Sequence, residues 1–198
     1  MTIITRRSFG LGVATATLTA CSAAPVPTDT YYRLVPTGSL PTRNGAPIKG
    51  TAEVAPIRGD GVVNARALLF RGAAGQLQQY SYQFWADTPA SLLQRSLIET
   101  LRAAKMFDTV AAPEMRLDRD YEIMGTLRKL EHDLQGSGHA VIEVELGVRK
   151  VIGNNVLLLK VYAADVAVAG SGMPAVVSAC SAGLGQIFSQ FLADLGQI

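Results

Sequence analysis

A strict alternation in the second half of the chain constrains the fold most strongly. Every second residue from 140 to 148 is apolar: Ala140, Ile142, Val144, Leu146 and Val148. This period of two is typical of a strand with one face in the core and one in water. Gly153-Asn154-Asn155 predicts a turn, and residues 156–162, all apolar or aromatic except Lys160, predict a second strand that completes a hairpin.

Other segments predict further strands. Residues 30–34 and 51–57 are rich in strand formers, and residues 67–71 and 77–84, joined by a glycine-containing turn, predict another hairpin. Residues 121–130 are a further strand candidate, with Tyr121, Ile123, Gly125 and Leu127 on one face.

Two segments carry a helical period. Thr88 and Pro89 are a suitable cap and first residue for a helix over 89–105, with leucines spaced along one face. A second helix is expected over 175–195, where Gly183 and Gly185 weaken it by roughly 1 kcal/mol each unless close packing requires them. We therefore expect one α+β domain over residues 31–198, a mostly antiparallel sheet with two amphipathic helices packed on one face.

The N-terminus has the properties of an export signal. Residues 1–20 contain Arg6 and Arg7, no acidic residue and a short run of apolar and small residues. The apolar run is shorter than the roughly 20 residues that span a bilayer. Residues 5–9 resemble a twin-arginine signal, but an ordinary signal also tolerates two arginines, so the export route stays open.

Leu18-Thr19-Ala20-Cys21 resembles the lipobox of bacterial lipoproteins. We expect residues 1–20 to be removed, the thiol of Cys21 to carry the lipid, and residues 21–30 to form a lipidated, flexible tether. Two or more acyl chains anchor a protein stably, whereas one does so marginally. The alternative is a buried free cysteine behind an ordinary cleavage site. In many Gram-negative bacteria an Asp directly after the lipidated cysteine favours retention at the inner membrane. This chain has Ser22 at that position, which indicates the periplasmic face of the outer membrane rather than the inner membrane.

Charge and cysteine content exclude some functions. Without Arg6 and Arg7, the 18 basic residues of the chain fall to 16 and balance the 16 acidic ones, so nothing indicates nucleic-acid binding. Cys180 is then the single cysteine besides Cys21, and no intramolecular disulfide is expected.

No catalytic or metal-binding pattern emerges. His132 and His139 lack a metal-ligand spacing, and no phosphate-binding glycine loop is present. Glu143 and Glu145 lie two apart on one strand face, where solvated charges are the simplest interpretation. We expect no enzyme activity, no cofactor and no metal.

The aromatic stretch before the first helix has two interpretations. Tyr82, Phe84 and Trp85 are candidates for an apolar groove or interface. Trp85 can instead be a core residue that packs the start of the helix onto the sheet.

The most distinctive pattern joins these elements. Phe84-Trp85-Ala86-Asp87-Thr88-Pro89 leads into the leucine-rich helix, and Phe107 and Val110 follow it. Together with Tyr32-Arg33-Leu34 and Asp120-Tyr121-Glu122-Ile123, this stretch resembles the ABC-type transport auxiliary lipoproteins over most of the mature chain. It departs from the family at Phe70, where tyrosine is usual, and in the loop 58–66, which lacks the family's common proline.

The resemblance implies a non-catalytic role beside an ABC permease, an ATPase and a mammalian-cell-entry (MCE) domain protein that move lipids or other hydrophobic compounds between the two membranes. It also implies a possible homo-oligomer, because some relatives form rings. The alternative is a lipoprotein for envelope assembly or stability that is unconnected with transport. Cargo, direction of transport and binding surface stay open.

Overall fold

The computed structural model describes residues 27–198, and the predicted lipid-attachment residue Cys21 lies outside them. Its strands are β1 (Thr30–Tyr32), β2 (Ile48–Val54), β3 (Arg58–Gly59), β4 (Ala67–Arg71), β5 (Leu77–Trp85), β6 (Phe107–Ala111), β7 (Tyr121–Asp133), β8 (His139–Lys150) and β9 (Asn155–Ala167). Its α-helices are α1 (Pro89–Ala103) and α2 (Gly172–Leu195), and short 3-10 turns cover Gly61–Asn64 and Pro113–Met115.

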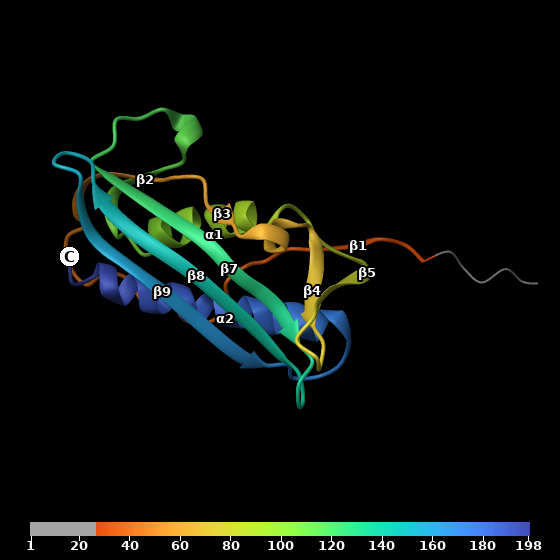
Figure 1. Cartoon of the computed structure of the whole chain (residues 1–198). Coiled ribbons are helices and arrows are strands. Elements are labelled where there is room, and N and C mark those ends of the chain that lie inside the picture. The colour runs from red at the N-terminus through yellow and green to blue at the C-terminus, as the bar shows by residue number, and fades with distance from the viewer. Residues whose placement is uncertain (1–26) are drawn as a thin grey trace, which may run out of the picture.

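The strands form a single sheet built around β7 (Figure 1). On one side of β7 lies β8, which in turn pairs with β9, both antiparallel. On the other side, β2, β3 and β4 contact successive parts of β7 in parallel. Beyond them, β6 pairs with β2 and β1 pairs with β5, again in parallel.

The prediction of a mostly antiparallel sheet is wrong. The sheet is mixed, and five of the eight strand pairs within the described chain are parallel. The antiparallel pairs are the two predicted hairpins, β4–β5 and β8–β9, together with β7–β8. The parallel pairs join strands that are distant in sequence, and alternation within one strand carries no information about such partners.

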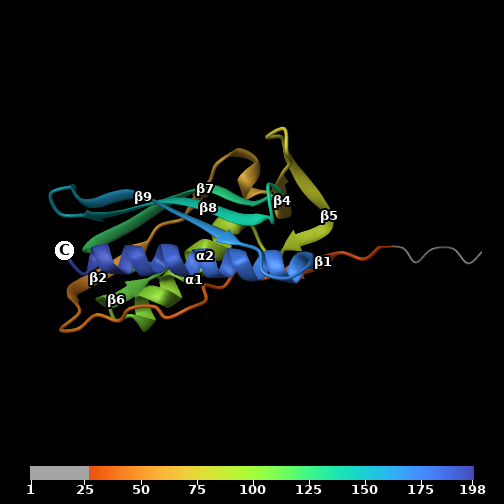
Figure 2. The same ribbon diagram turned by 90° about the horizontal axis from the view of Figure 1, so that it is seen from below.

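Both helices lie on the same face of the sheet (Figure 2). The buried stripe of α1 includes Leu93, Leu97 and Leu101, and α2 packs beneath β8 and β9. By length and composition α2 could cross a membrane, but 61% of its most apolar stretch is buried inside the protein. It is therefore a core helix, and the opposite face of β7, β8 and β9 is left without a covering helix (Figure 1).

Candidate interaction surfaces

The two histidines have structural partners. The Tyr80 hydroxyl lies 2.7 Å from Nδ1 of His132, and burial lowers the pKa of this histidine. His139 Nδ1 lies 2.6 Å from Asp165 on the surface. Among residues 27–198, no group of three or more His, Cys, Asp or Glu side chains could hold a metal ion.

Glu143 and Glu145 lie on the uncovered face of the sheet and form ion pairs with basic residues of β7. Lys129 Nζ donates to Glu143 at 2.8 Å, and Arg128 pairs with Glu145. Each carboxylate thus has a basic partner, which is typical of a solvated sheet face rather than of an acid–base pair.

The structure separates the three predicted aromatic residues. Trp85 is 2% exposed and lies in the core, so it contributes to no surface. Tyr82 is 45% exposed and has a φ of 60°, in the left-handed region. The pairing of β5 with β4 is irregular between Gln79 and Phe84, which pair with Leu69 and Ala67. This bulge interrupts the alternation of β5 and exposes the ring of Tyr82.

The exposed Tyr82 and the half-buried Phe84 lie at the end of the molecule where the described chain begins. Parallel pairing of β1 with β5 places Tyr31 opposite Phe84, with ring centroids 5.8 Å apart. The Arg66 guanidinium lies 5.3 Å from the centre of the Tyr31 ring, and Arg66 also donates to the carbonyls of Trp85 and Ala86. We call this cluster the aromatic end and define it by Tyr31, Val35, Tyr82 and Phe84 with Arg33 and Arg66.

Sequence reasoning did not single out Tyr31. Its pairing partner lies 53 residues away in the chain, and a parallel pair of this kind leaves no local signal. The one available hint was the strand-forming composition of residues 30–34.

A second surface lies at the opposite edge of the sheet. In the described part of the chain, β9 pairs with β8 alone, so the backbone groups on its outer edge have no strand partner. Its exposed side chains include four large apolar ones, Val156, Leu157, Leu159 and Val161, besides the charged Lys160 and Asp165. We call the four apolar residues the apolar edge. Solvent-facing edge strands usually carry charges or prolines that prevent pairing with another chain. On β9 both charged side chains already have partners, Lys160 with Asp194 and Asp165 with His139, and the four apolar side chains are exposed beside them.

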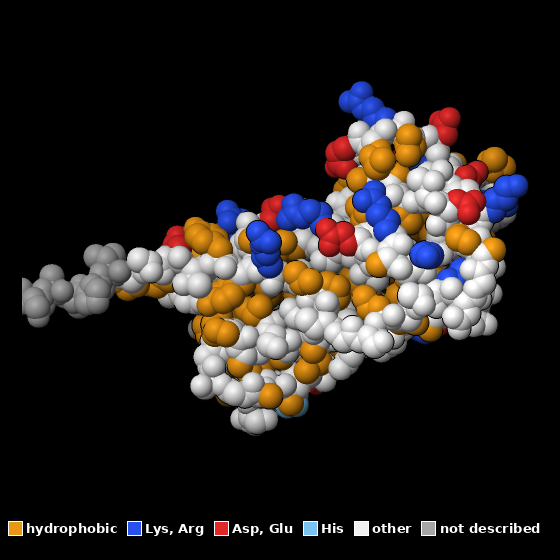
Figure 3. All heavy atoms as spheres, turned by 180° about the vertical axis from the view of Figure 1, so that it is seen from behind, with side chains coloured by type: hydrophobic (Ala, Val, Ile, Leu, Met, Phe, Trp, Pro, Cys, Tyr) orange, Lys and Arg blue, Asp and Glu red, His pale blue; other side chains and the backbone are white. Residues whose placement is uncertain are grey.

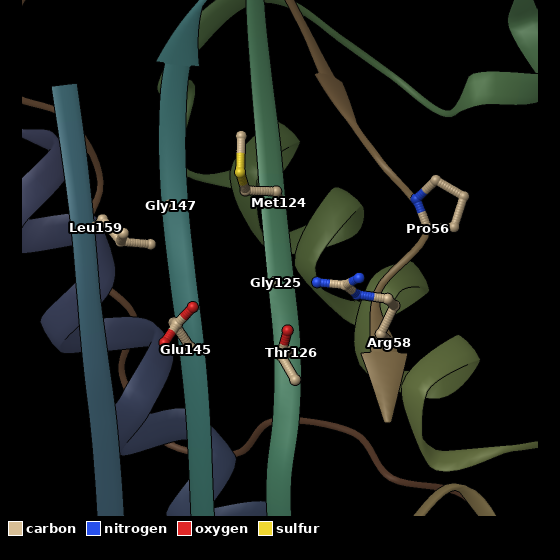
Figure 4. A pocket seen from close by; sticks show the side chains of 8 residues that line it. All are labelled: Pro56, Arg58, Met124, Gly125, Thr126, Glu145, Gly147 and Leu159. Atoms are coloured by element: carbon tan, nitrogen blue, oxygen red, sulfur yellow. The ribbon is translucent and has the colours of Figure 1, made fainter. Parts of the chain in front are cut away.

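A shallow hollow leads from the apolar edge across the uncovered face (Figure 4). Its volume is about 170 Å³, and Met124, Leu159, Pro56, Arg58 and Glu145 are among its lining residues. Gly147 shapes the hollow, because a Cβ at this position would lie 3.0 Å from Leu159 Cδ1 and 3.4 Å from Met124 Cγ. The hollow extends the apolar edge toward β3 and has polar groups at its margin.

Comparisons with known proteins identify the fold and the family. The family model described as "ABC-type transport auxiliary lipoprotein component" matches residues 32–191. The crystal structure of XCC0632 from Xanthomonas campestris, a DUF330 protein, is similar with a TM-score of 0.73 and 20% identity, over 85% of this chain and 97% of that one. The crystal structure of an uncharacterized protein is similar with a TM-score of 0.65 and 16% identity, over 86% and 98%. No curated relative matches the chain.

Proposed function

The chain belongs to the ABC-type transport auxiliary lipoprotein family, and on this premise we propose that it is a non-catalytic docking subunit of an ABC-type transport system. In this proposal Cys21 carries the acyl chains that hold the protein at a membrane of the bacterial envelope. The folded domain then contacts the other subunits of the transporter.

The apolar edge is the observation that carries the docking role. It combines 13 residues of β9, which have no strand partner on one side among residues 27–198, with four exposed apolar side chains. An extended segment of a partner can add to such an edge through main-chain hydrogen bonds, and apolar side chains add affinity and specificity. The adjoining hollow beside Gly147 offers room for a side chain from that segment.

The finer parts of the proposal rest on the sequence. The resemblance stated above supports an MCE-domain protein, a permease and an ATPase as partners and a hydrophobic compound such as a lipid as cargo. Ser22 supports the periplasmic face of the outer membrane. A role in handing cargo from one subunit to the next follows from the same resemblance.

Affinity purification from detergent-solubilised membranes tests the proposal. A C-terminally tagged wild-type chain should recover the permease, ATPase or MCE-domain subunits, and a Leu159→Lys/Val161→Lys variant should not. Leu134→Lys is the matched control, because Leu134 is also an exposed leucine but lies outside β9. Recovery of envelope-assembly proteins with no transport subunit would contradict the proposal and favour the envelope-assembly alternative.

A further inference from the structure

We propose that the aromatic end rests in the phospholipid headgroup region of the bilayer to which Cys21 is attached. The domain then stands on this membrane by its β1–β5 end. This inference rests on the acylation of Cys21 in the proposed function and adds a defined contact surface and orientation to it.

The length of the chain between the anchor and the fold limits the distance to the membrane. Eight residues, 22–29, separate Cys21 from the first residue of β1. Fully extended, they span at most about 29 Å. The end that carries β1 is therefore held within reach of the headgroups.

The side chains at this end suit a membrane interface. Tyr31, Tyr82 and Val35 are 54%, 45% and 52% exposed. Tyrosine combines an apolar ring with a polar hydroxyl and is enriched where hydrocarbon meets water. Figure 3 shows hydrophobic side chains interspersed with both basic and acidic side chains at the end where the described chain begins.

Basic and acidic groups both lie at this end, where the Tyr31 hydroxyl donates to Asp29 at 3.2 Å, and the two arginines are the groups suited to phosphate. Neither Arg33 nor Arg66 forms an ion pair within residues 27–198, whereas Asp87 is paired with Arg95 at 3.0 Å. Arg33 and Val35 also line a hollow of about 390 Å³ beside α1. The Arg66 guanidinium is held by two backbone carbonyls and by the Tyr31 ring, so its positive charge is fixed in place without a carboxylate partner. Positive charges beside apolar side chains match the headgroup region, where phosphates lie next to the acyl chains.

The orientation places the apolar edge away from the membrane. β8 runs for 12 residues, about 40 Å at the usual rise per residue, and ends at the β8–β9 turn. This turn lies at the opposite end of the molecule from β1 (Figure 1). Ile152 at the turn is 77% exposed, so it provides a reference point distant from the bilayer.

Site-directed labelling of the acylated protein in vesicles of phosphatidylethanolamine and phosphatidylglycerol tests the orientation. Tyr31→Cys and Ile152→Cys are labelled with a fluorophore and exposed to a water-soluble quencher. Cys180 does not interfere, because it is buried and burial raises the pKa of its thiol to about 12. The same labels in the unacylated Cys21→Ser chain are the control.

We expect the label at position 31 to become about fivefold less accessible to the quencher in the acylated protein, as for a group buried at the interface, and the label at 152 to stay unchanged. The inference would be overturned if the labels at positions 31 and 152 of the vesicle-bound protein were equally accessible to the quencher. It would also be overturned if the label at position 31 were shielded to the same extent in solution without vesicles. Recovery of transport subunits is measured with the same preparations. Recovery without shielding refutes the orientation alone, and shielding without recovery supports the orientation while refuting the proposed function.

Discussion

The carbonyl oxygen of Thr37 lies against Gly185 in the middle of α2, so closely that an added Cβ would be 1.9 Å from it. The segment after β1 is fixed there by a further bond, in which the Thr37 amide donates to the Ser181 carbonyl at 3.1 Å. A glycine that weakens the helix by sequence criteria is thus required by the close approach of another backbone segment.

Gly185→Ala should therefore destabilise the protein. The clash involves backbone atoms, so overpacking should outweigh the gain in helix propensity and lower the free energy of unfolding by about 2 kcal/mol. Urea denaturation followed by circular dichroism measures the change. Gly183→Ala is the control, because its nearest contact is the movable Ile142 Cδ1 at 3.0 Å, and its effect should stay within about 1 kcal/mol. Equal effects at both positions would contradict this explanation.

Tyr162 and Lys160 on β9 both donate to Oδ2 of Asp194 near the end of α2, at 2.8 and 2.9 Å. These bonds, first from Lys160 and then from Tyr162, hold the pKa of Asp194 below its ordinary value. Burial raises the pKa of Tyr162, and its bond to Asp194 raises it further. Tyr162→Phe removes one donor and should lower the free energy of unfolding by about 1 kcal/mol in urea denaturation.

The lowered pKa of Asp194 predicts a pH dependence. A carboxyl group whose pKa is lower in the folded state stabilises the protein above its unfolded pKa, and this contribution is lost as the pH falls through the folded pKa. The stability difference between wild type and Asp194→Asn should therefore be constant from pH 7 to about 5, begin to fall near the unfolded pKa of about 4, and reach its minimum only below the lowered folded pKa. Urea titrations at a series of pH values measure it. A difference independent of pH would show that the charge of Asp194 is not involved.

Tyr82→Asn should separate stability from membrane contact. Asparagine tolerates a left-handed φ better than tyrosine, for which this conformation costs about 1–2 kcal/mol. The variant should unfold at the same temperature as wild type or higher, while a fluorophore at position 31 becomes more accessible to an aqueous quencher in vesicles. A lower unfolding temperature would show that the Tyr82 ring stabilises the fold itself.

The extent to which the sequence predicts this protein differs between its parts. Both helices and both hairpins follow from local patterns, such as the leucine spacing of α1 and the alternation from Ala140 to Val148. Parallel pairs such as Tyr31 with Phe84 depend on distant segments. The family was recognisable because Phe84–Pro89 joins a strand to a helix with distinctive residue types.

The two surfaces were harder to predict. Period-two alternation shows that Leu159 and Val161 share a face of their strand. It does not show that β9 is an edge strand, because that depends on the pairing of all the other described strands. Tyr82 and Phe84 were found as candidates from aromatic content alone, whereas burial of Trp85 and the bulge in β5 required the structure.

Photo-crosslinking in intact cells tests the central claim most directly. A photoreactive phenylalanine derivative replaces Val161 on the apolar edge or, as the control, the exposed Leu134. The account predicts that position 161 crosslinks to a subunit of an ABC-type transport system and that position 134 does not. Absence of such a crosslink at 161 from an acylated, folded protein, or crosslinks only to proteins outside any transport system, would contradict the account.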